Sequence, residues 1–340
     1  MKNYINKKKI YSITTMTPHR ISFAGGGTDY PKYYSKNEGS VINSTINKYL
    51  FVTVKAHGEI FSEKYRLMYS QTEFCNSISQ IKNNIVRECL KLVPVKAPVT
   101  ISTISDLPPE SGTGSSSCFT VGLLNALHAF RGERVSPGQL ALEACKIEIE
   151  KLKKFSGKQD QYASAFGGIN KFFFSKNGQV KILPISISSE NINNLFSNIR
   201  LLWTDLQRDS SKVAQSYNFS AQNDIQQKLH VDTVNEFQNL IEKKKLNYEL
   251  LSNVIKKTWD AKRNFSKHIS PTYIENMSKQ LDKINIKGHR LVGAGAGGFF
   301  LCLLKNKIQI SKLKKKFNKN KIIEVEYEPQ GSRVISLINN

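Results

Sequence analysis

The residues best suited to chemistry lie in a loop rich in glycine and serine. The loop reads PESGTGSSS and comprises Pro109, Glu110, Ser111, Gly112, Thr113, Gly114, Ser115, Ser116 and Ser117. Its glycines allow positive φ and a close approach of the backbone to a ligand. Its serines stand where a helix begins, so their hydroxyls and the free N–H groups of the first turn would point to one spot. Such a helix start binds anions, usually phosphate. An ordinary serine-capped helix explains the same residues equally well.

A second glycine-rich loop ends in a carboxylate. Gly25, Gly26 and Gly27 are followed directly by Thr28 and Asp29. Because glycine lets a ligand approach the backbone closely, this loop could bind a small molecule with a carboxylate beside it. The competing interpretation is a flexible turn in which Asp29 caps the segment that follows.

An arginine precedes this second loop. It lies on a strand expected over residues 11–24, which we expect Pro18 to break. Arg20 alternates with apolar residues and therefore projects from the opposite face of that strand. It could hold an anion beside the glycine loop, or it could pair with Asp29.

Three acidic residues follow the serine loop along the chain. Glu148 and Glu150 are two positions apart on an expected helix, so only one of them can face inward. Asp160 lies in a polar stretch just before an apolar helical turn. Beside a phosphate loop, an aspartate can orient a hydroxyl or accept its proton. It can equally well cap the helix of residues 161–166.

A third glycine-rich segment lies near the C-terminal end. Residues 288–304 read GHRLVGAGAGGFFLCLL and include Gly295 and Gly297. A dinucleotide-binding fingerprint requires a helix after its glycines, whereas residues 299–304 read as a strand. The segment is therefore interpreted as strand, glycine loop and strand, packing on a neighbour or flanking a phosphate.

Length and composition indicate a globular protein. The chain of 340 residues is 39% hydrophobic and 10% aromatic, and it can bury one large core or two domains. No uncharged apolar run approaches the roughly 18 residues of a membrane span. The first residues lack the apolar stretch and cleavage site of a secretory signal. We therefore expect a cytoplasmic protein with no membrane partner.

The net charge of +23 raises the question of nucleic-acid binding. The lysines are dispersed, and the dense cluster at residues 305–321 has the spacing of an amphipathic helix with a solvated basic face. Since no recognised nucleic-acid motif is present, we expect no nucleic-acid partner. The five cysteines are scattered and odd in number, which excludes a disulfide framework and a zinc site. The six histidines form no metal-binding pattern.

The expected elements divide the chain in two. Helices are expected over 117–130 and from Ser136 to about residue 153, followed by a hairpin over 168–187. A strand at 199–204, polar helices over 211–283 and a strand at 325–335 complete the chain. The polar segment between 185 and 197 suggests a boundary, giving domains of residues 1–190 and 191–340.

Three segments together resemble the motifs of the GHMP kinase superfamily of small-molecule kinases. They are TPHRISFAGGGTDY (17–30), LPPESGTGSSSCFTVGLLNAL (107–127) and VGAGAGGFF (292–300), and their order and spacing both match. With GKQDQYASAFGG (157–168), the first segment resembles the sugar-1-kinase branch. The resemblance implies an α+β fold of two domains. The first would be similar to the ribosomal-protein-S5-like fold, and the second would be ferredoxin-like.

The resemblance also implies roles for the candidate residues. The serine loop would wrap the phosphates of ATP, and Ser116 would hold Mg²⁺ with Glu148, Glu150 being the alternate. Asp160 would face the acceptor hydroxyl as a base or as an orienting charge, and Arg20 would steady Asp160 or the γ-phosphate. Gly26, Gly27, Thr28 and Asp29 would receive sugar hydroxyls. Gly295 and Gly297, also counted among the substrate-binding residues, belong to the third glycine segment, which would back the phosphate site.

The activity implied is an ATP-dependent kinase for the anomeric hydroxyl of a sugar phosphate, namely conversion of D-glycero-D-manno-heptose 7-phosphate to the 1,7-bisphosphate. The second phosphate of such a substrate needs cations, and Arg208, Lys212 and Lys158 are candidates. A kinase of an unphosphorylated sugar of fucose or galactose type is an alternative, although GGGTD differs from the GEHTD of galactokinases. A catalytically silent regulator that binds a sugar or nucleic acid is another. A monomer or a homodimer is expected.

Overall fold

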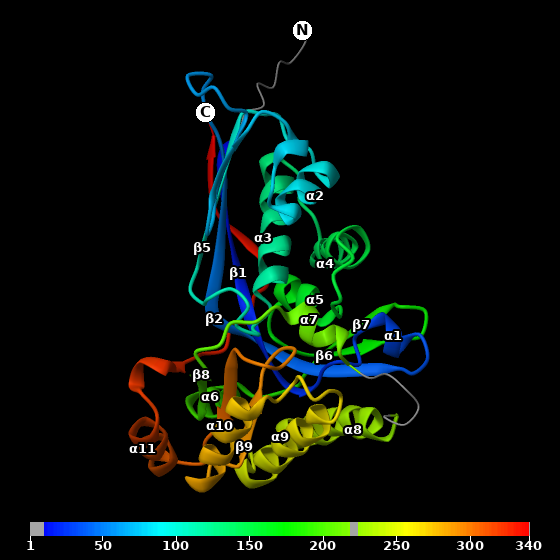
Figure 1. Cartoon of the computed structure of the whole chain (residues 1–340), viewed down its shortest axis with the longest axis vertical. Helices are drawn as coiled ribbons and strands as arrows, with labels where there is room; N and C mark the ends of the chain where they lie inside the picture. The colour runs from blue at the N-terminus through cyan, green and yellow to red at the C-terminus, as the bar shows by residue number, and fades with distance from the viewer. Residues whose placement is uncertain (1–9, 218–223, 340) are drawn as a thin grey trace.

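The computed structural model describes residues 10–217 and 224–339, which form two β-sheets with helices packed on them (Figure 1). The larger sheet has the strand order β12-β1-β2-β5-β3-β4, and a hairpin of β6 and β7 is attached to the other half of β2. Its strands are β1 (Ile10–Gly25), β2 (Gly39–Ala56), β3 (Tyr65–Met68), β4 (Thr72–Cys75), β5 (Val99–Ser105), β6 (Ile169–Phe174), β7 (Val180–Pro184) and β12 (Arg333–Asn339).

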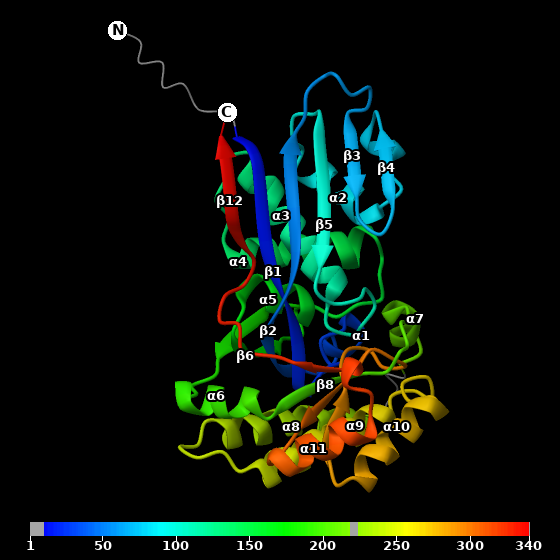
Figure 2. The same ribbon diagram turned by 90° about the vertical axis from the view of Figure 1, so that its left-hand side faces the viewer.

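Helices cover one face of this larger sheet, as Figures 1 and 2 show from two sides. They are α2 (Asn84–Leu92), α3 (Ser115–Phe130), α4 (Pro137–Cys145) and α5 (Gln159–Phe166), with the short α1 (Pro31–Tyr34), the 3₁₀ turn η1 (Ile78–Gln80) and the π-helical turn η2 (Lys146–Lys151). Ten of the 16 residues of helix α3 are buried because the helix lies directly on β1 and β2. A Cβ at Gly122 would lie 2.7 Å from Oγ1 of Thr17, so only glycine allows this approach.

The smaller sheet is antiparallel, with the order β11-β8-β10-β9. Its strands are β8 (Ile199–Trp203), β9 (Gly288–Leu291), β10 (Phe299–Leu303) and β11 (Ile322–Glu324). Around it lie α6 (Ser189–Ser197), α7 (Ser210–Gln215), α8 (Asp224–Ile241), α9 (Tyr248–Arg263), α10 (Thr272–Lys283), α11 (Lys307–Lys316) and the 3₁₀ turn η4 (Lys319–Lys321). The two-domain α+β architecture predicted from the sequence is confirmed.

The two sheets share a hydrophobic core. Phe23 at the end of β1 stacks on Phe237 of α8, with ring centroids 5.1 Å apart. The same buried cluster includes Ile42 of β2 and Leu301 of β10. Apolar contacts of this kind hold the end of β1, and with it the first glycine loop, against the second domain.

Two expected strands differ from the structure. Pro18 does not break the first strand, because the register against β2 shifts between Pro18 and Arg20 and this irregularity accommodates the proline. The strand expected at 325–335 is replaced by β11 and β12, and the segment between them crosses from the smaller sheet to the larger one. Tyr327 pairs with Ile46 on the way as an isolated bridge.

The last strand, β12, pairs antiparallel with β1 in the larger sheet. Strand β12 therefore belongs to the same sheet as β1, although the boundary predicted after residue 190 assigns β12 to the second domain. That boundary otherwise stays a prediction. The expected polar helices correspond to α7–α10, and residues 218–223 of that range lie outside the described part of the chain. No helix among the described residues is long and apolar enough to span a membrane.

Candidate active site

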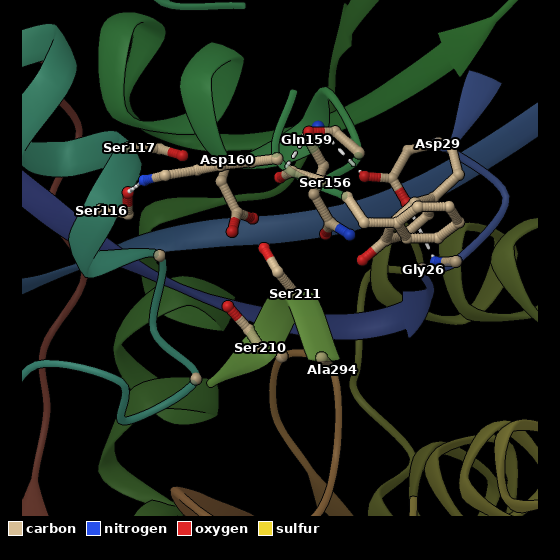
Figure 3. Close-up of a pocket in the computed structure, with 18 of the residues that line it drawn as sticks. Gly26, Asp29, Ser116, Ser117, Ser156, Gln159, Asp160, Ser210, Ser211 and Ala294 are labelled. Carbon is tan, nitrogen blue, oxygen red and sulfur yellow. Dashed lines mark hydrogen bonds between the residues drawn. The ribbon is translucent and has the colours of Figure 1, made fainter. Parts of the chain in front are cut away.

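A cavity of about 470 Å³ lies where the three glycine-rich segments meet. Its lining includes Gly26, Asp29, Gly114, Asp160 and Gly293, so the loops that the sequence singled out are brought together. Figure 3 shows Asp160 between Ser116 and Ser117 on one side and Gly26 and Asp29 on the other.

The serine loop leads into the N-terminus of α3. The helix begins at Ser115, two residues before the predicted start, and its N-cap is Gly114 with φ of 80°. No side chain caps this end. Ser115, Ser116 and Ser117 therefore occupy the first turn rather than the N-cap. All three line the cavity, so the free N–H groups of that turn offer an anion site there.

The rest of the loop builds its shape. Ser111 and Thr113 are fully buried and bonded through their hydroxyls at 2.9 Å, and Thr113 also contacts Nδ1 of His19 at 3.1 Å. Pro109, Ser111 and Thr113 do not line the cavity, whereas Glu110 and Gly112 do.

The third glycine segment packs against this loop. A Cβ at Gly112 would lie 2.6 Å from the carbonyl oxygen of Val292, and one at Gly298 would lie 2.1 Å from that of Ser111. Gly295 and Gly297, counted among the substrate-binding residues, pack on Ile269 and Leu206 and do not line the cavity. The interpretation as strand, loop and strand is confirmed by β9 and β10.

Glu148 points inward from η2 and is 1% exposed, whereas Glu150 is exposed. The Ser116 hydroxyl donates to Oε1 of Glu148, the Ser117 hydroxyl donates to Oε2 at 2.7 Å, and the Gln161 amide donates to Oε2 at 2.8 Å. The structure thus decides between the two glutamates, because the π-helical turn directs Glu148 toward α3.

A lysine lies beside this glutamate and serine. Nζ of Lys154 donates to the Ser116 hydroxyl at 2.7 Å and lies 3.4 Å from Oε1 of Glu148. Lys153, in the left-handed region at φ of 50°, turns the chain so that Lys154 reaches this position. The Lys154 ammonium lies between a hydroxyl and a carboxylate oxygen, a position that a metal cation could take in its place. Such hard oxygen donors fit a magnesium ion, which takes few protein ligands. Among the described residues, no cluster of three or more histidine, cysteine or acidic side chains could hold a metal.

Asp160 pairs with Arg20, and the alternative pairing of Arg20 with Asp29 is wrong. Nε and Nη2 of Arg20 lie 2.7 and 2.6 Å from Oδ1 of Asp160, and Nη1 donates to the Gly112 carbonyl at 2.6 Å. The arginine side chain is 3% exposed and that of Asp160 is 22% exposed. Asp160 sits in the first turn of α5. One arginine thus connects the carboxylate to the serine loop.

Asp29 is buried at the end of the first glycine loop. It accepts the Gly27 N–H at 2.9 Å and the Gln159 N–H at 3.2 Å. Burial raises its pKa, and the charge of Asp160 adds to the effect. It does not cap α1, whose N-cap is Tyr30. Thr28, expected to receive a sugar hydroxyl, is not part of the lining, because its hydroxyl is bonded to the backbone of Ser40.

Of the three cations named for a second phosphate, only Arg208 lines the cavity. It donates to the carbonyls of Gly295 and Glu110 across the third glycine segment. Lys158 is turned away, since its Nζ donates to the Gly178 carbonyl at 2.6 Å. Lys212 is exposed on α7.

Sequence reasoning missed two buried cations that line the cavity, Lys262 of α9 and Arg290 of β9. Lys262 donates to the Gly293 carbonyl, and Arg290 donates to those of Phe23 and Gly25 at 3.0 and 3.1 Å. Burial lowers the pKa of Lys262 well below its usual value and that of Arg290 to about 9. Arg290 lies within the third glycine-rich segment, in the strand that leads to Gly293, and this position is a usable signal. No feature of the sequence distinguishes Lys262 from the many other lysines of the polar helices.

The comparisons with known proteins agree with this geometry. Residues 79–168 match the family model described as the GHMP kinases N terminal domain. The chain is 29% identical over 310 residues to a D-glycero-alpha-D-manno-heptose 7-phosphate kinase from Campylobacter jejuni, covering 85% of this chain and 88% of the relative. It is 24% identical over 324 residues to a galactokinase from Pyrococcus furiosus, covering 86% and 89%.

Solved structures show the same fold. A D-glycero-D-manno-heptose 1-phosphate kinase from Bacteroides thetaiotaomicron superposes with a TM-score of 0.79 at 19% identity, covering 96% of this chain and all of that one. A mevalonate kinase from Methanococcus jannaschii superposes with a TM-score of 0.70 at 18% identity, covering 93% and 98%. The predicted fold class is confirmed by these neighbours.

Proposed function

The chain belongs to the GHMP kinase superfamily, and from that premise we propose that it phosphorylates the anomeric hydroxyl of a sugar phosphate. Its relatives are sugar kinases, so the chain is a phosphotransferase that uses an alcohol group as acceptor. D-glycero-D-manno-heptose 7-phosphate, converted to the 1,7-bisphosphate, is the proposed substrate. The similarity to a kinase named for this sugar, over most of both chains, supports that choice. The product would serve the synthesis of nucleotide-activated heptose for surface polysaccharide.

The observation that carries the proposal is the position of Asp160. It lies beside the uncapped start of α3, where a Cβ on Gly114 would be 3.4 Å from the Asp160 carboxyl carbon. A phosphate bound by the N–H groups of α3 would therefore lie next to a carboxylate able to orient an attacking hydroxyl. Arg20 fixes that carboxylate and, through Gly112, the loop that holds the phosphate. Positioning and charge stabilisation are the main sources of catalysis in phosphoryl transfer.

In the proposed reaction the anomeric oxygen forms a bond to the γ-phosphorus of ATP, and the bond between that phosphorus and the β–γ bridging oxygen breaks to release ADP. Asp160 receives the hydroxyl proton or holds the hydroxyl in line until the proton is lost. Ser116 and Glu148 would hold Mg²⁺, which neutralises phosphate charge when bound. Asp29 and the backbone of Gly26 and Gly27 would accept and donate to sugar hydroxyls.

A kinase of an unphosphorylated sugar is the second candidate, and the similarity to a galactokinase over most of both chains favours it. A silent regulator would not require the acidic and hydroxyl groups of the site. Asp160, Ser116 and Glu148 are all present and all line one cavity, which argues for an active enzyme.

The test is ADP release with a panel of acceptors and the wild-type protein beside Asp160→Ala. The panel contains heptose 7-phosphate, mannose 6-phosphate, fucose and galactose. Turnover of heptose 7-phosphate alone, lost in the variant, supports the proposal. Turnover of a neutral sugar alone would refute the sugar-phosphate substrate and leave the kinase in place. ATP binding without turnover of any acceptor would favour the regulator.

A further inference from the structure

The cavity contains two buried cations that the catalytic arrangement does not use. Lys262 is 2% exposed and Arg290 is 1% exposed, yet both line the cavity. Within residues 10–217 and 224–339, neither has a carboxylate within ion-pair distance. The nearby Arg20 differs from them, because Asp160 neutralises its charge.

Their hydrogen bonds leave donors free. Arg290 uses Nη1 and Nη2 on the carbonyls of Phe23 and Gly25, while its buried Nε has no partner within the described chain. Lys262 gives one bond to the Gly293 carbonyl, although an ammonium has three donors. Nη2 of Arg208 is also buried without a partner among the described residues. Free donors on buried cations are able to bind an anion that enters the cavity.

Burial of charge without a counterion is strongly unfavourable. The pKa of Lys262 agrees with this. Burial is the main cause that lowers it, and the neighbouring charges of Arg290, Arg208 and Arg20 lower it further. A bound anion would raise the pKa of Lys262, since a nearby negative charge favours the ammonium form.

The place of Arg290 separates it from the nucleotide phosphates. The phosphate loop and the start of α3 lie on one side of Asp160, and Gly26 and Asp29 lie on the other (Figure 3). Arg290 belongs to the second side, because its Nη2 would be 4.0 Å from a Cβ on Gly26 and it donates to the Gly25 carbonyl. An anion held here would therefore belong to the acceptor rather than to ATP.

We propose that Lys262 and Arg290 form a subsite for the phosphate that the sugar carries away from its reacting carbon, with Arg208 contributing from across the third glycine segment. This rests on the proposed function and names the groups that select a phosphorylated sugar. A neutral sugar leaves the two buried cations without a counterion, whereas a sugar phosphate supplies one. Selection thus follows from charge rather than from the shape of the ring.

The test is Lys262→Met, a substitution of similar length that removes the charge. Lys257→Met is the matched control, because Lys257 lies on the same helix but is exposed and pairs only with Glu236 among the described residues. KM and kcat are measured for heptose 7-phosphate and for the same heptose without its phosphate. Inorganic phosphate is tested in parallel as a competitor of the sugar phosphate.

Loss of one charge-assisted hydrogen bond is expected to raise KM for heptose 7-phosphate about 10- to 100-fold in Lys262→Met. The kcat/KM for the unphosphorylated heptose is expected to change by less than about 3-fold, and inhibition by inorganic phosphate to weaken. The Lys257→Met enzyme should match the wild type. Lys262→Gln, which keeps a donor for the Gly293 carbonyl without the charge, should behave like Lys262→Met.

If Lys262→Met loses kcat/KM equally for the phosphorylated and unphosphorylated heptose, or for neither, the subsite is overturned while the kinase proposal stands. A wild-type enzyme that turns over only neutral sugars would overturn the subsite together with the proposed substrate. Thermal melting shows whether the variants fold, and Lys262→Met is expected to fold with a somewhat lower melting temperature because the Gly293 carbonyl loses its donor.

Discussion

Replacement of Asp160 by Asn tests the central part of the site. The change keeps the shape of the side chain and removes its charge. Two effects are expected, because Asp160 faces the cavity and also neutralises Arg20. Loss of a group that handles the acceptor proton lowers kcat about 10²- to 10⁴-fold. Loss of the counter-charge leaves an arginine side chain that is 3% exposed with only neutral acceptors in the described structure, namely the amide oxygen of the variant side chain and the Gly112 carbonyl.

The cost of the second effect follows from this geometry. A hydrogen bond to a charged group contributes about 1.5–3 kcal/mol, and breaking a fully buried pair costs about 3–5 kcal/mol. Because the Asp160 side chain is 22% exposed, water partly compensates, so about 2 kcal/mol of lost unfolding free energy is expected.

A double-mutant cycle separates the two roles. Arg20→Met combined with Asp160→Asn removes both charges, so most of the lost stability should return, whereas kcat should stay low. Stability is measured by urea unfolding, and kcat by ADP release at saturating ATP and sugar. An Asp160→Asn enzyme that keeps kcat within about 10-fold of wild type would refute a proton-handling role for this residue.

Other parts of the structure give three further predictions. Glu148→Gln replaces one carboxylate oxygen, each of which accepts from two donors, by an NH₂ group, so urea unfolding should show a loss of about 1–3 kcal/mol, and half-maximal ADP release should need more Mg²⁺. Unchanged Mg²⁺ dependence would contradict the metal assignment. Gly298→Ala places a Cβ 2.1 Å from the Ser111 carbonyl at φ of 92°, so about 3 kcal/mol of stability and most affinity for ATP should be lost, as calorimetry would measure. Buried His19 and His289 have pKa values lowered to about 4, so the unfolded state binds more protons between pH 4 and 6.5. Stability present above pH 6.5 should fall with pH by about 3 kcal/mol per histidine at pH 4, and a flat urea midpoint across this window would contradict the burial.

Local features of the fold could be predicted from the sequence. The three glycine loops were predictable because positive φ is a property of single residues, and Gly27, Gly112 and Gly293 all adopt it. The helix opened by Ser136 and Pro137 is equally local, since the Ser136 hydroxyl accepts the Gln139 N–H. The ordered set of motifs predicted the superfamily and hence the fold.

Other features depend on neighbours that are distant in sequence. Arg20 and Asp160 are 140 positions apart, and the choice of Asp160 over Asp29 as the partner of Arg20 depends on how α5 packs on β1. Thr28, Gly295 and Gly297 have the residue types of binding positions, but tertiary packing uses them to fix the loops.

Neighbouring residues in the sequence specify which loops can bend around a phosphate, because backbone freedom and helix starts depend on a few adjacent positions. Which charges meet at those loops depends on the packing of distant segments. Glu148 faces inward because of a π-helical turn, and Lys262 is one lysine of a polar helix until packing buries it beside Arg290. Charge interactions depend on distance and burial, and both are set by the folded chain as a whole.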